Sequence, residues 1–410
     1  MRLFRRAFLI TAGVLGVGFM AIFFIEPWFI RKIYYRIKDR FEKPRKLSPD
    51  SERAEIVLPP EGETVSVEMA LNSRCNSDYD ENPKRFHWGM FDRNRKLSDA
   101  QIEKIIRLAK IPRFTDRKVE IQSERNMLTS AIDNRPSGLP RDWIMVESGM
   151  QQQAVGLVCA ALGVGMVFRN LGKDGTAISD TEHATVKFKL DAMKPTYDGS
   201  FWSSSPPAGI KPWSEGNLPD PVRDGHKPLI SALENLKIEN NNGRKATDPS
   251  ISQLVWAARG RAPHLYKSKP WGMTIPTAQG KQNTSCVYFI SENTLYRYVN
   301  WDKNGPTHSL EVLGDIDTDL ENQLLQLFPS FNCFFVIGII ETSGIALWEV
   351  GYQLLNILLQ AHSLNVTYQA VLLSETHKTI LRRMHIEHPV VLVAVNRGNE
   401  HLHNSFGRSL

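Results

Sequence analysis

One stretch of this sequence occurs twice, and the repeat constrains the fold more than any other feature. Glu147-Ser-Gly149-Met-Gln151 opens an apolar run that reaches Leu162, and Glu349-Val-Gly351-Tyr-Gln353 opens a second run that reaches Leu364. Corresponding residues of the two copies are 202 positions apart throughout. Self-similarity at a fixed spacing is the signature of a duplicated structural unit. The chain is therefore predicted to hold two related halves, each built on a helix that carries the pattern E-x-G-x-Q.

The two repeated helices are apolar on most of their faces. Residues 154–167 contain no charged side chain, and residues 351–361 are apolar apart from a few uncharged polar positions. A helix that is apolar all round must be buried. Each copy alone reads as a plain core helix, but in a duplicated chain each can be the partner of the other. The chain is therefore expected to carry its own dimer interface.

The N-terminal segment is expected to anchor the chain in a membrane. Residues 7–25 are nineteen consecutive uncharged and mostly apolar positions, which is long enough to cross a bilayer as a helix. No small-x-small cleavage site ends the run, so we expect an uncleaved single-pass anchor with Trp28 at the interface. The larger cluster of Lys and Arg follows between Arg31 and Lys46. The positive-inside rule then predicts the body of the protein on the cytoplasmic side.

Charge and cysteine usage exclude two classes of function. Up to Lys46 the chain has eleven Lys and Arg and three Asp and Glu, a net charge of +8, so the remainder carries −2 of the total +6. The basic excess therefore suits anionic lipid at the membrane, and a nucleic-acid partner is not expected. The four cysteines show no CxxC spacing, so neither a disulfide framework nor a zinc site is expected.

The chain divides into residues 1–46, the anchor and its basic flank; residues 47–215, a first half; and residues 216–410, a second half. Helices are expected at 66–74, 97–110 and 246–259, and strands at 186–193, 285–291, 295–299 and 390–395. Residues 195–228 read as a long surface connector. The second half has about 53 more residues before its repeated helix. The first half is accordingly expected to have only a compressed, polar connection at that place.

The order of these motifs resembles the nitroreductase family of flavoproteins, and most of all its branch of azoline-forming peptide dehydrogenases. The matching stretches are Leu254-Val-Trp-Ala-Ala258, Pro276-Thr-Ala-Gln-Gly280, Val287-Tyr-Phe-Ile290, Glu349–Asn356 and Val390–Val395. Together they span most of residues 230–400. Residues 66–195 match more weakly, and the anchor does not match.

The resemblance implies an α+β fold in which the two halves form an intramolecular pseudo-dimer, with central sheets flanked by helices. Members of the family are usually homodimers that hold FMN between their subunits. Their phosphate-binding motif, Arg-Arg-Ser-x-Arg, reads here as Arg74-Cys-Asn-Ser-Asp78, so only the first arginine is kept. When Ala70 is aligned with Ala232, the second half has Leu236 opposite Arg74.

The resemblance implies one complete cofactor site per chain, formed by Arg74 of the first half and the loop Pro276–Gly280 of the second. The reciprocal site lacks both the arginine and the loop, because Lys110–Thr115 matches the loop poorly. The predicted cofactor-binding residues are Arg74, Asn76, Arg169, Asn170, Lys194, Pro276, Thr277, Ala278, Gln279 and Gly280. Arg397, which follows the last strand, is a further phosphate candidate.

In this family the flavin performs hydride transfer, so no catalytic acid or base is assigned and no metal is expected. The implied function is a membrane-anchored, FMN-dependent oxidoreductase that acts on a small organic or peptide substrate, with NAD(P)H as a candidate electron donor. Two alternatives stay open. Loss of most of the arginine motif favours a flavin-free scaffold or binding subunit at the membrane. A protein in which residues 334–361 insert into a membrane would have to bury Glu341 and Glu349.

Overall fold

The structure is a computed structural model. It describes residues 52–58, 65–77, 95–115, 119–124, 127–133, 141–169, 183–192, 216–263, 271–276, 284–340, 344–386 and 388–398. The predicted anchor lies outside these residues, as do Asn170, Lys194 and Thr277–Gly280. Across the described ranges, no helix combines the length and the apolar character that a membrane crossing requires.

The described helices are α3 (Val67–Ser77), α5 (Asp99–Leu108), α6 (Arg141–Ala161), α8 (Leu229–Asn235), α9 (Asp248–Arg259), α10 (Thr318–Leu327), α11 (Gly344–Ser363) and α12 (Glu375–Arg383). Helices α3, α5 and α9 confirm the three helices that the sequence predicts in the same places. Ser98 and Thr247, the predicted capping residues, directly precede α5 and α9.

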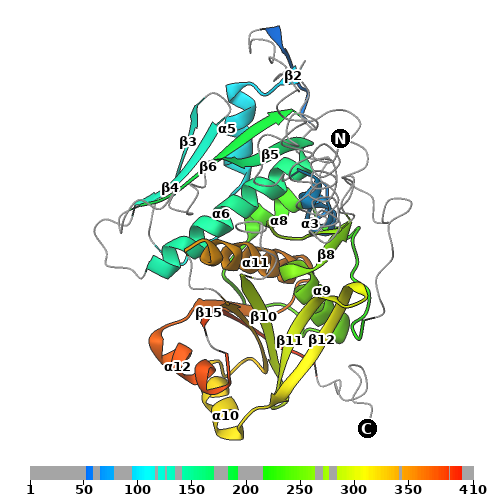
Figure 1. Cartoon of the computed structure of the whole chain (residues 1–410), viewed down its shortest axis with the longest axis vertical. Coiled ribbons are helices and arrows are strands. Elements are labelled where there is room, and N and C mark those ends of the chain that lie inside the picture. The colour runs from blue at the N-terminus through cyan, green and yellow to red at the C-terminus, as the bar shows by residue number, and fades with distance from the viewer. Residues whose placement is uncertain are drawn as a thin grey trace, which may run out of the picture.

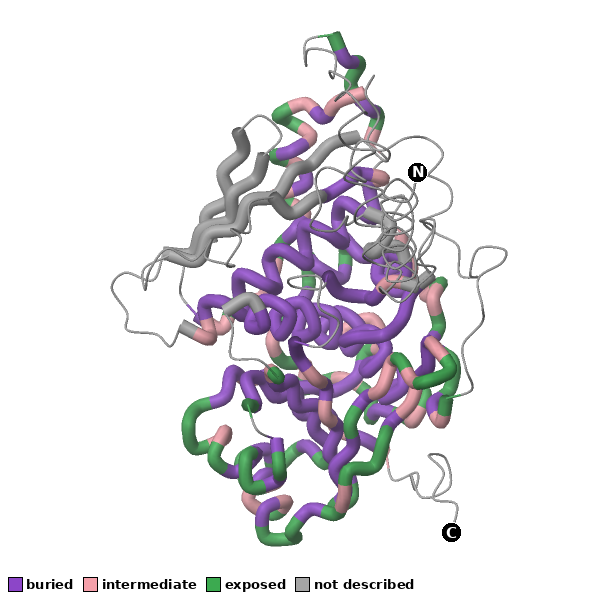
Figure 2. Tube along the Cα trace, viewed as in Figure 1, coloured by how far each residue is buried: buried purple, intermediate pink, exposed green. Residues whose placement is uncertain are grey.

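The two repeated helices, α6 and α11, lie against each other in the middle of the molecule (Figure 1). Both are buried along nearly all of their described length (Figure 2). The prediction that each repeated helix finds its partner in the other is confirmed. Their mutual burial explains why neither has the polar face of an ordinary surface helix.

The glycine of each repeat lies where the two helices touch. A Cβ built on Gly149 would overlap with the carbonyl oxygen of Trp348, and a Cβ built on Gly351 would overlap with that of Val146. Trp348 is the counterpart of Val146 at the 202-residue spacing, so the same contact is made once in each direction. Reciprocal contacts of this kind are the pattern of a two-fold interface.

The starts of α3 and α8 repeat this reciprocity. The backbone N–H of Val67 donates to the carbonyl of Lys227 at 3.0 Å, and the N–H of Leu229 donates to the carbonyl of Val65 at 3.0 Å. Exchanging equivalent positions of the two helices turns the first bond into the second. This backbone contact and the glycine contact are therefore both made once in each direction.

Each half contributes its own antiparallel sheet. The first half forms the order β3-β4-β6-β5 and the second forms β12-β11-β10-β13-β15-β14-β7. The strands of the first sheet are β3 (Val119–Glu124), β4 (Met127–Asp133), β5 (Val164–Arg169) and β6 (His183–Ala192). Those of the second are β7 (Glu239–Asn240), β10 (Ser285–Ser291), β11 (Thr294–Asp302), β12 (Gly305–Asp315), β13 (Cys333–Ile339), β14 (Tyr368–Leu372) and β15 (Pro389–Val395). Two short pairs complete the described strands, β1 (Ala54–Glu55) with β2 (Arg95–Lys96), and β8 (Arg261–Pro263) with β9 (Trp271–Met273).

The four strands β3-β4-β6-β5 follow the same order as β10-β13-β15-β14 in the second half. The second half adds β11, β12 and α10 between β10 and β13, which accounts for much of its greater length. The prediction of a merely compressed, polar connection in the first half is wrong, because β3 and β4 occupy it. Apolar Val119 and Ile121 alternate there with Glu120 and Gln122. Such period-2 alternation in the sequence is typical of a strand although its average composition is polar.

Two hydrophobic cores lie on the two faces of the second sheet. The larger core includes the inward faces of α6, α9 and α11, and the smaller one lies under α10 and α12. Every residue of β15 is buried as a result. The alternative in which residues 334–361 insert into a membrane does not hold, because this stretch divides between β13, an inner strand of the sheet, and α11.

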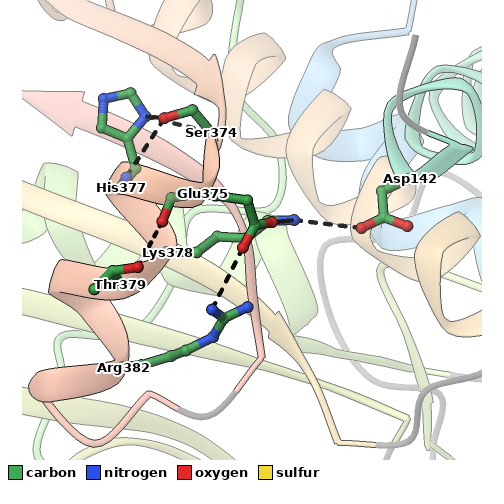
Figure 3. Close-up of polar contacts among 7 residues, drawn as sticks. All are labelled: Asp142, Ser374, Glu375, His377, Lys378, Thr379 and Arg382. Carbon is green, nitrogen blue, oxygen red and sulfur yellow. Dashed lines mark hydrogen bonds and ion pairs between the residues drawn. The ribbon is translucent and has the colours of Figure 1, made fainter. Parts of the chain in front are cut away.

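A polar contact joins α12 to the first turn of α6 (Figure 3). Nζ of Lys378 lies 3.5 Å from Oδ2 of Asp142 and 3.0 Å from Oε1 of Glu375. The lysine side chain is mostly buried, whereas both carboxylates are exposed to water. Exposed ion pairs contribute only about 0–1 kcal/mol, so this contact orients α12 more than it stabilises the fold.

The close approach of the central helices predicts an unusual response to Gly→Ala substitution. Alanine in a helix interior normally stabilises by about 1 kcal/mol relative to glycine. At Gly149 or Gly351 the new Cβ would meet a backbone carbonyl that cannot rotate away, so the helices must separate. We expect each variant to lose about 1–3 kcal/mol and to show a lower Tm in thermal denaturation.

Gly156→Ala is the matched control on the same helix. Its Cβ would lie 2.9 Å from the terminal methyl of Met166, a flexible group that can move aside. This variant should keep or slightly raise the Tm. Equal Tm values for all three variants would contradict the predicted role of the glycines.

Candidate functional site

Helix α3 brings together elements that carry several of the predicted site positions. It lies against β8 and β9 of the second half and against α6 and β5 of the first; Figure 1 shows α3 beside β8. Arg74 and Asn76 belong to α3, Arg169 ends β5, and Pro276 closely follows β9. The side chains of the first three are not described, so the structure groups these positions by their elements. Asn170, Lys194 and Thr277–Gly280 lie outside the described residues.

The strand end that leads into Pro276 is held by both central helices. Nε2 of Gln153, on α6, donates to the carbonyl of Thr274 at 3.0 Å and to Oδ1 of Asn356 at 2.8 Å. Nδ2 of Asn356, on α11, donates to the same carbonyl at 3.1 Å and to that of Ala257 at 2.9 Å. Both amide side chains are fully buried. One residue from each half therefore fixes the backbone two positions before Pro276.

In the first half, the repeated glutamate ties down the segment that follows α5. Oε1 of Glu147 accepts hydrogen bonds from the backbone N–H groups of Phe114 and Thr115 at 2.6 and 2.8 Å, and Oε2 accepts the Thr115 hydroxyl at 2.6 Å. Burial raises the pKa of Glu147, and these hydrogen bonds partly offset the rise. Nε2 of Gln151 adds a bond to the carbonyl of Ala109 at 2.8 Å. These hydrogen bonds therefore fix the segment from Ala109 to Thr115 against α6.

In the second half, the equivalent side chains bind other groups. Oε2 of Glu349 accepts from the Ser285 hydroxyl at 2.8 Å and lies 3.3 Å from the guanidinium of Arg259. Nε2 of Gln353 donates to the same hydroxyl at 2.7 Å. The repeat here joins the end of α9 to the start of β10. The same E-x-G-x-Q pattern thus serves different contacts in the two halves.

The place equivalent to the predicted site on the other side of the interface is filled. Leu236, opposite Arg74 in the alignment, is buried, and α8 lies against α5 and α6. Ile111 and Phe114 pack against the larger core. Among the described residues, the ion pair of Lys110 is an exposed one with Glu234, 3.7 Å long. Apolar side chains therefore occupy the place where a second cofactor site would need charged ones.

Buried positive charge lies close to the α3–β8 contact. Burial, together with the neighbouring charge of Arg259, lowers the pKa of Arg261 to about 10. The Arg261 guanidinium bonds weakly to Asn300 and lies 4.7 Å from the ring centroid of Trp301. No carboxylate pairs with it among the described residues. An anionic group near α3 would find a favourable potential there.

One feature of the described residues fits a flavin at this junction. The buried positive charge on β8 suits a phosphate. Arg397, the further phosphate candidate, does not fit, because Asp248 and Glu292 bind its buried guanidinium at 2.6 and 3.1 Å.

A buried Ser–His–Tyr chain in the second half holds the connector between the halves. The Ser252 hydroxyl donates to the carbonyl of Pro219 at 2.6 Å and accepts from Nε2 of His308 at 2.8 Å, while Nδ1 of His308 accepts from the Tyr298 hydroxyl at 2.8 Å. The serine proton is already used by the carbonyl. This arrangement is structural and is not a nucleophilic triad.

His308 predicts a loss of stability in acid. Burial, assisted by the charge of Arg223, lowers the pKa of His308 to about 3 in the folded protein, whereas an unfolded histidine titrates near 6.5. Below pH 6.5 the unfolded chain therefore binds a proton that the folded chain rejects. Stability should fall as the pH drops from about 6.5 towards 3. Between pH 7.5 and 5.0 this group alone should cost about 2 kcal/mol.

Urea unfolding of the protein and of His308→Gln at both pH values checks this expectation. The variant should be less stable at pH 7.5 but should lose less stability on acidification. The same pH dependence in both proteins would show that His308 titrates normally.

No protein-family model matches the chain, and no curated protein matches it. Six chains of solved structures do, and among them are two that are assigned as nitroreductases. The one from Ralstonia eutropha JMP134 is 22% identical, with a TM-score of 0.35 over 48% of this chain and 99% of that chain. The one from Anabaena variabilis ATCC 29413 is 10% identical, with a TM-score of 0.43 over 67% and 69%. Both TM-scores are below 0.5, so these similarities carry no argument about function. The function is therefore argued from the residues of this chain.

Proposed function

We propose that this chain is an FMN-dependent oxidoreductase of the nitroreductase type, whose two halves act as an intramolecular pseudo-dimer and hold one flavin between them. The observation that carries the proposal is the reciprocity of the interface. Gly149 meets Trp348 as Gly351 meets Val146, and the starts of α3 and α8 exchange equivalent backbone hydrogen bonds. A two-fold pair of halves of this kind is the arrangement that the family resemblance requires for a flavin at the interface.

The asymmetry of the interface supports a single site. The first half contributes α3 with Arg74, and the second contributes the strand end that leads into Pro276. On the opposite side, Leu236 and the segment held by Glu147 fill the equivalent place. We therefore propose one FMN per chain.

In this proposal each part of the site has a separate task. Arg74 and Asn76 hold the phosphate, with Lys194 as a further proposed cation, because a guanidinium offers forked, charge-assisted donors. The loop Pro276–Gly280 approaches the ring through its backbone and small side chains, and Arg169 and Asn170 contact the ring edge. When bound, the FMN supplies the hydride chemistry. The chain binds and orients it and excludes water. The substrate is a small organic or peptide molecule, with NAD(P)H as the proposed electron donor.

Attachment to a membrane completes the proposal. It is supported by the uncharged run at residues 7–25 and by the basic residues that follow up to Lys46. A single-pass anchor with this flank would hold the two halves on the cytoplasmic side.

A flavin-free scaffold at the membrane is the second candidate. It is favoured by one observation, that Asp78 stands where the family motif has its last arginine. A carboxylate there repels a phosphate, and a site that has lost its ligand can persist as a binding surface.

Flavin content separates the two candidates. We expect the purified full chain, in detergent, to show flavin absorbance and to release about one FMN per chain. Arg74→Ala should weaken FMN binding about 10- to 100-fold, because a charge-assisted hydrogen bond contributes about 1.5–3 kcal/mol.

Lys110→Ala is the control, since it removes an exposed cation from the opposite side of the interface. It should leave the FMN content unchanged. A colourless protein that takes up no added FMN would rule out the oxidoreductase and leave the scaffold.

A further inference from the structure

We propose that Gln153 and Asn356 form a clamp that positions the proposed cofactor site by fixing the strand end Thr274–Pro276 from both halves at once. This inference rests on the proposed function, because that strand end leads into the loop assigned to the flavin. It assigns a role to Gln153, which the family motifs do not identify and which comes from the half that lacks the loop, and it gives a task to Asn356, the last residue of the matching stretch Glu349–Asn356.

The contacts leave Thr274 little freedom. Its carbonyl accepts hydrogen bonds from Gln153 on α6 and from Asn356 on α11. Its N–H donates to the carbonyl of Gly260 at 3.0 Å, and its hydroxyl bonds to the carbonyl of Trp256 at 3.3 Å. Thr274 is completely buried. Every polar atom of this residue is therefore tied to one of the central helices or to the end of α9.

The clamp exists in only one direction across the interface. At the 202-residue spacing, the counterpart of Gln153 is Leu355 and the counterpart of Asn356 is Ala154. Both counterparts are completely buried and apolar. The polar pair thus reaches the half that has the Pro276–Gly280 loop, and apolar residues occupy the equivalent positions facing the half that does not. The asymmetry of the clamp matches the asymmetry of the proposed site.

Packing alone does not account for Gln153. Its Oε1 is buried without a donor in the part of the chain that the structure describes, and an unsatisfied buried acceptor lowers stability. Leucine fills the equivalent position at 355 without that loss. The amide is best explained by what its nitrogen does, which is to hold Asn356 and Thr274 together across the two halves.

Gln153→Leu tests the clamp through two measurements. The FMN dissociation constant of the full chain should rise at least 10-fold. Hydrogen exchange of the Thr274 and Ile275 amides in the flavin-free protein should become at least 10-fold faster, because the strand end loses its anchor to α6. The Tm of the flavin-free protein should fall, because the substitution leaves Oδ1 of Asn356 buried without its donor, although it also removes the unsatisfied Oε1.

Gln152→Leu is the matched control. Gln152 neighbours Gln153, is fully buried, and also bridges the halves, because its Oε1 accepts the Tyr352 hydroxyl at 2.5 Å. It makes no contact with Thr274 among the hydrogen bonds of the described residues. This variant should lower the Tm but leave both the FMN dissociation constant and the exchange of the Thr274 amide unchanged.

The outcomes separate the clamp from the proposed function. If the wild-type chain binds no FMN but Gln153→Leu still accelerates exchange at Thr274, the clamp stands and the proposed function fails. If the wild-type chain binds FMN and Gln153→Leu binds it equally well, the clamp is overturned while the function stands. Unchanged exchange at Thr274 in Gln153→Leu also overturns the clamp.

Discussion

The direct backbone contact between α6 and α11 is the constraint on which the rest of the structure depends. Because Gly149 and Gly351 have no Cβ, each helix presents a bare stretch of backbone to a carbonyl of the other. At that separation, side chains one turn further along the helices can reach across to the opposite half. Gln153 lies four residues after Gly149, and its reach to Thr274 depends on how closely the helices approach.

In a homodimer every substitution appears on both sides of the axis, so a site cannot be kept on one side and closed on the other. The two halves of this chain are not bound by that rule, because each has its own sequence. Glu147 holds the segment after α5 on α6, whereas Glu349 is bound by Arg259 and Ser285. The backbone contacts between α6 and α11 are made once in each direction, and the polar contacts around them differ between the halves.

The sequence predicted the features that depend on local pattern. The repeated helices, the capped helices α5 and α9, and strands β6, β10, β11 and β15 all follow from apolar periodicity and turn signals. It failed at β3 and β4, where the alternation is short and polar residues dominate. The cofactor positions came from family resemblance, and the structure groups only their elements around α3. The Gln153–Thr274 contact joins residues 121 positions apart, so no local pattern contains it. The sequence did contain one sign of this contact. The 202-residue spacing aligns Gln153 with Leu355, so a polar residue stands where the other repeated helix has an apolar one.

The connector has a consequence for how the two halves find each other. Residues 216–228 are pinned to the second half through Pro219 and His308 and meet the first half beside Val65. A tether of this kind converts association into an intramolecular event, with an effective concentration in the millimolar range for short linkers. Pairing then does not depend on abundance, so a single copy of the chain is as fully assembled as a crowded population.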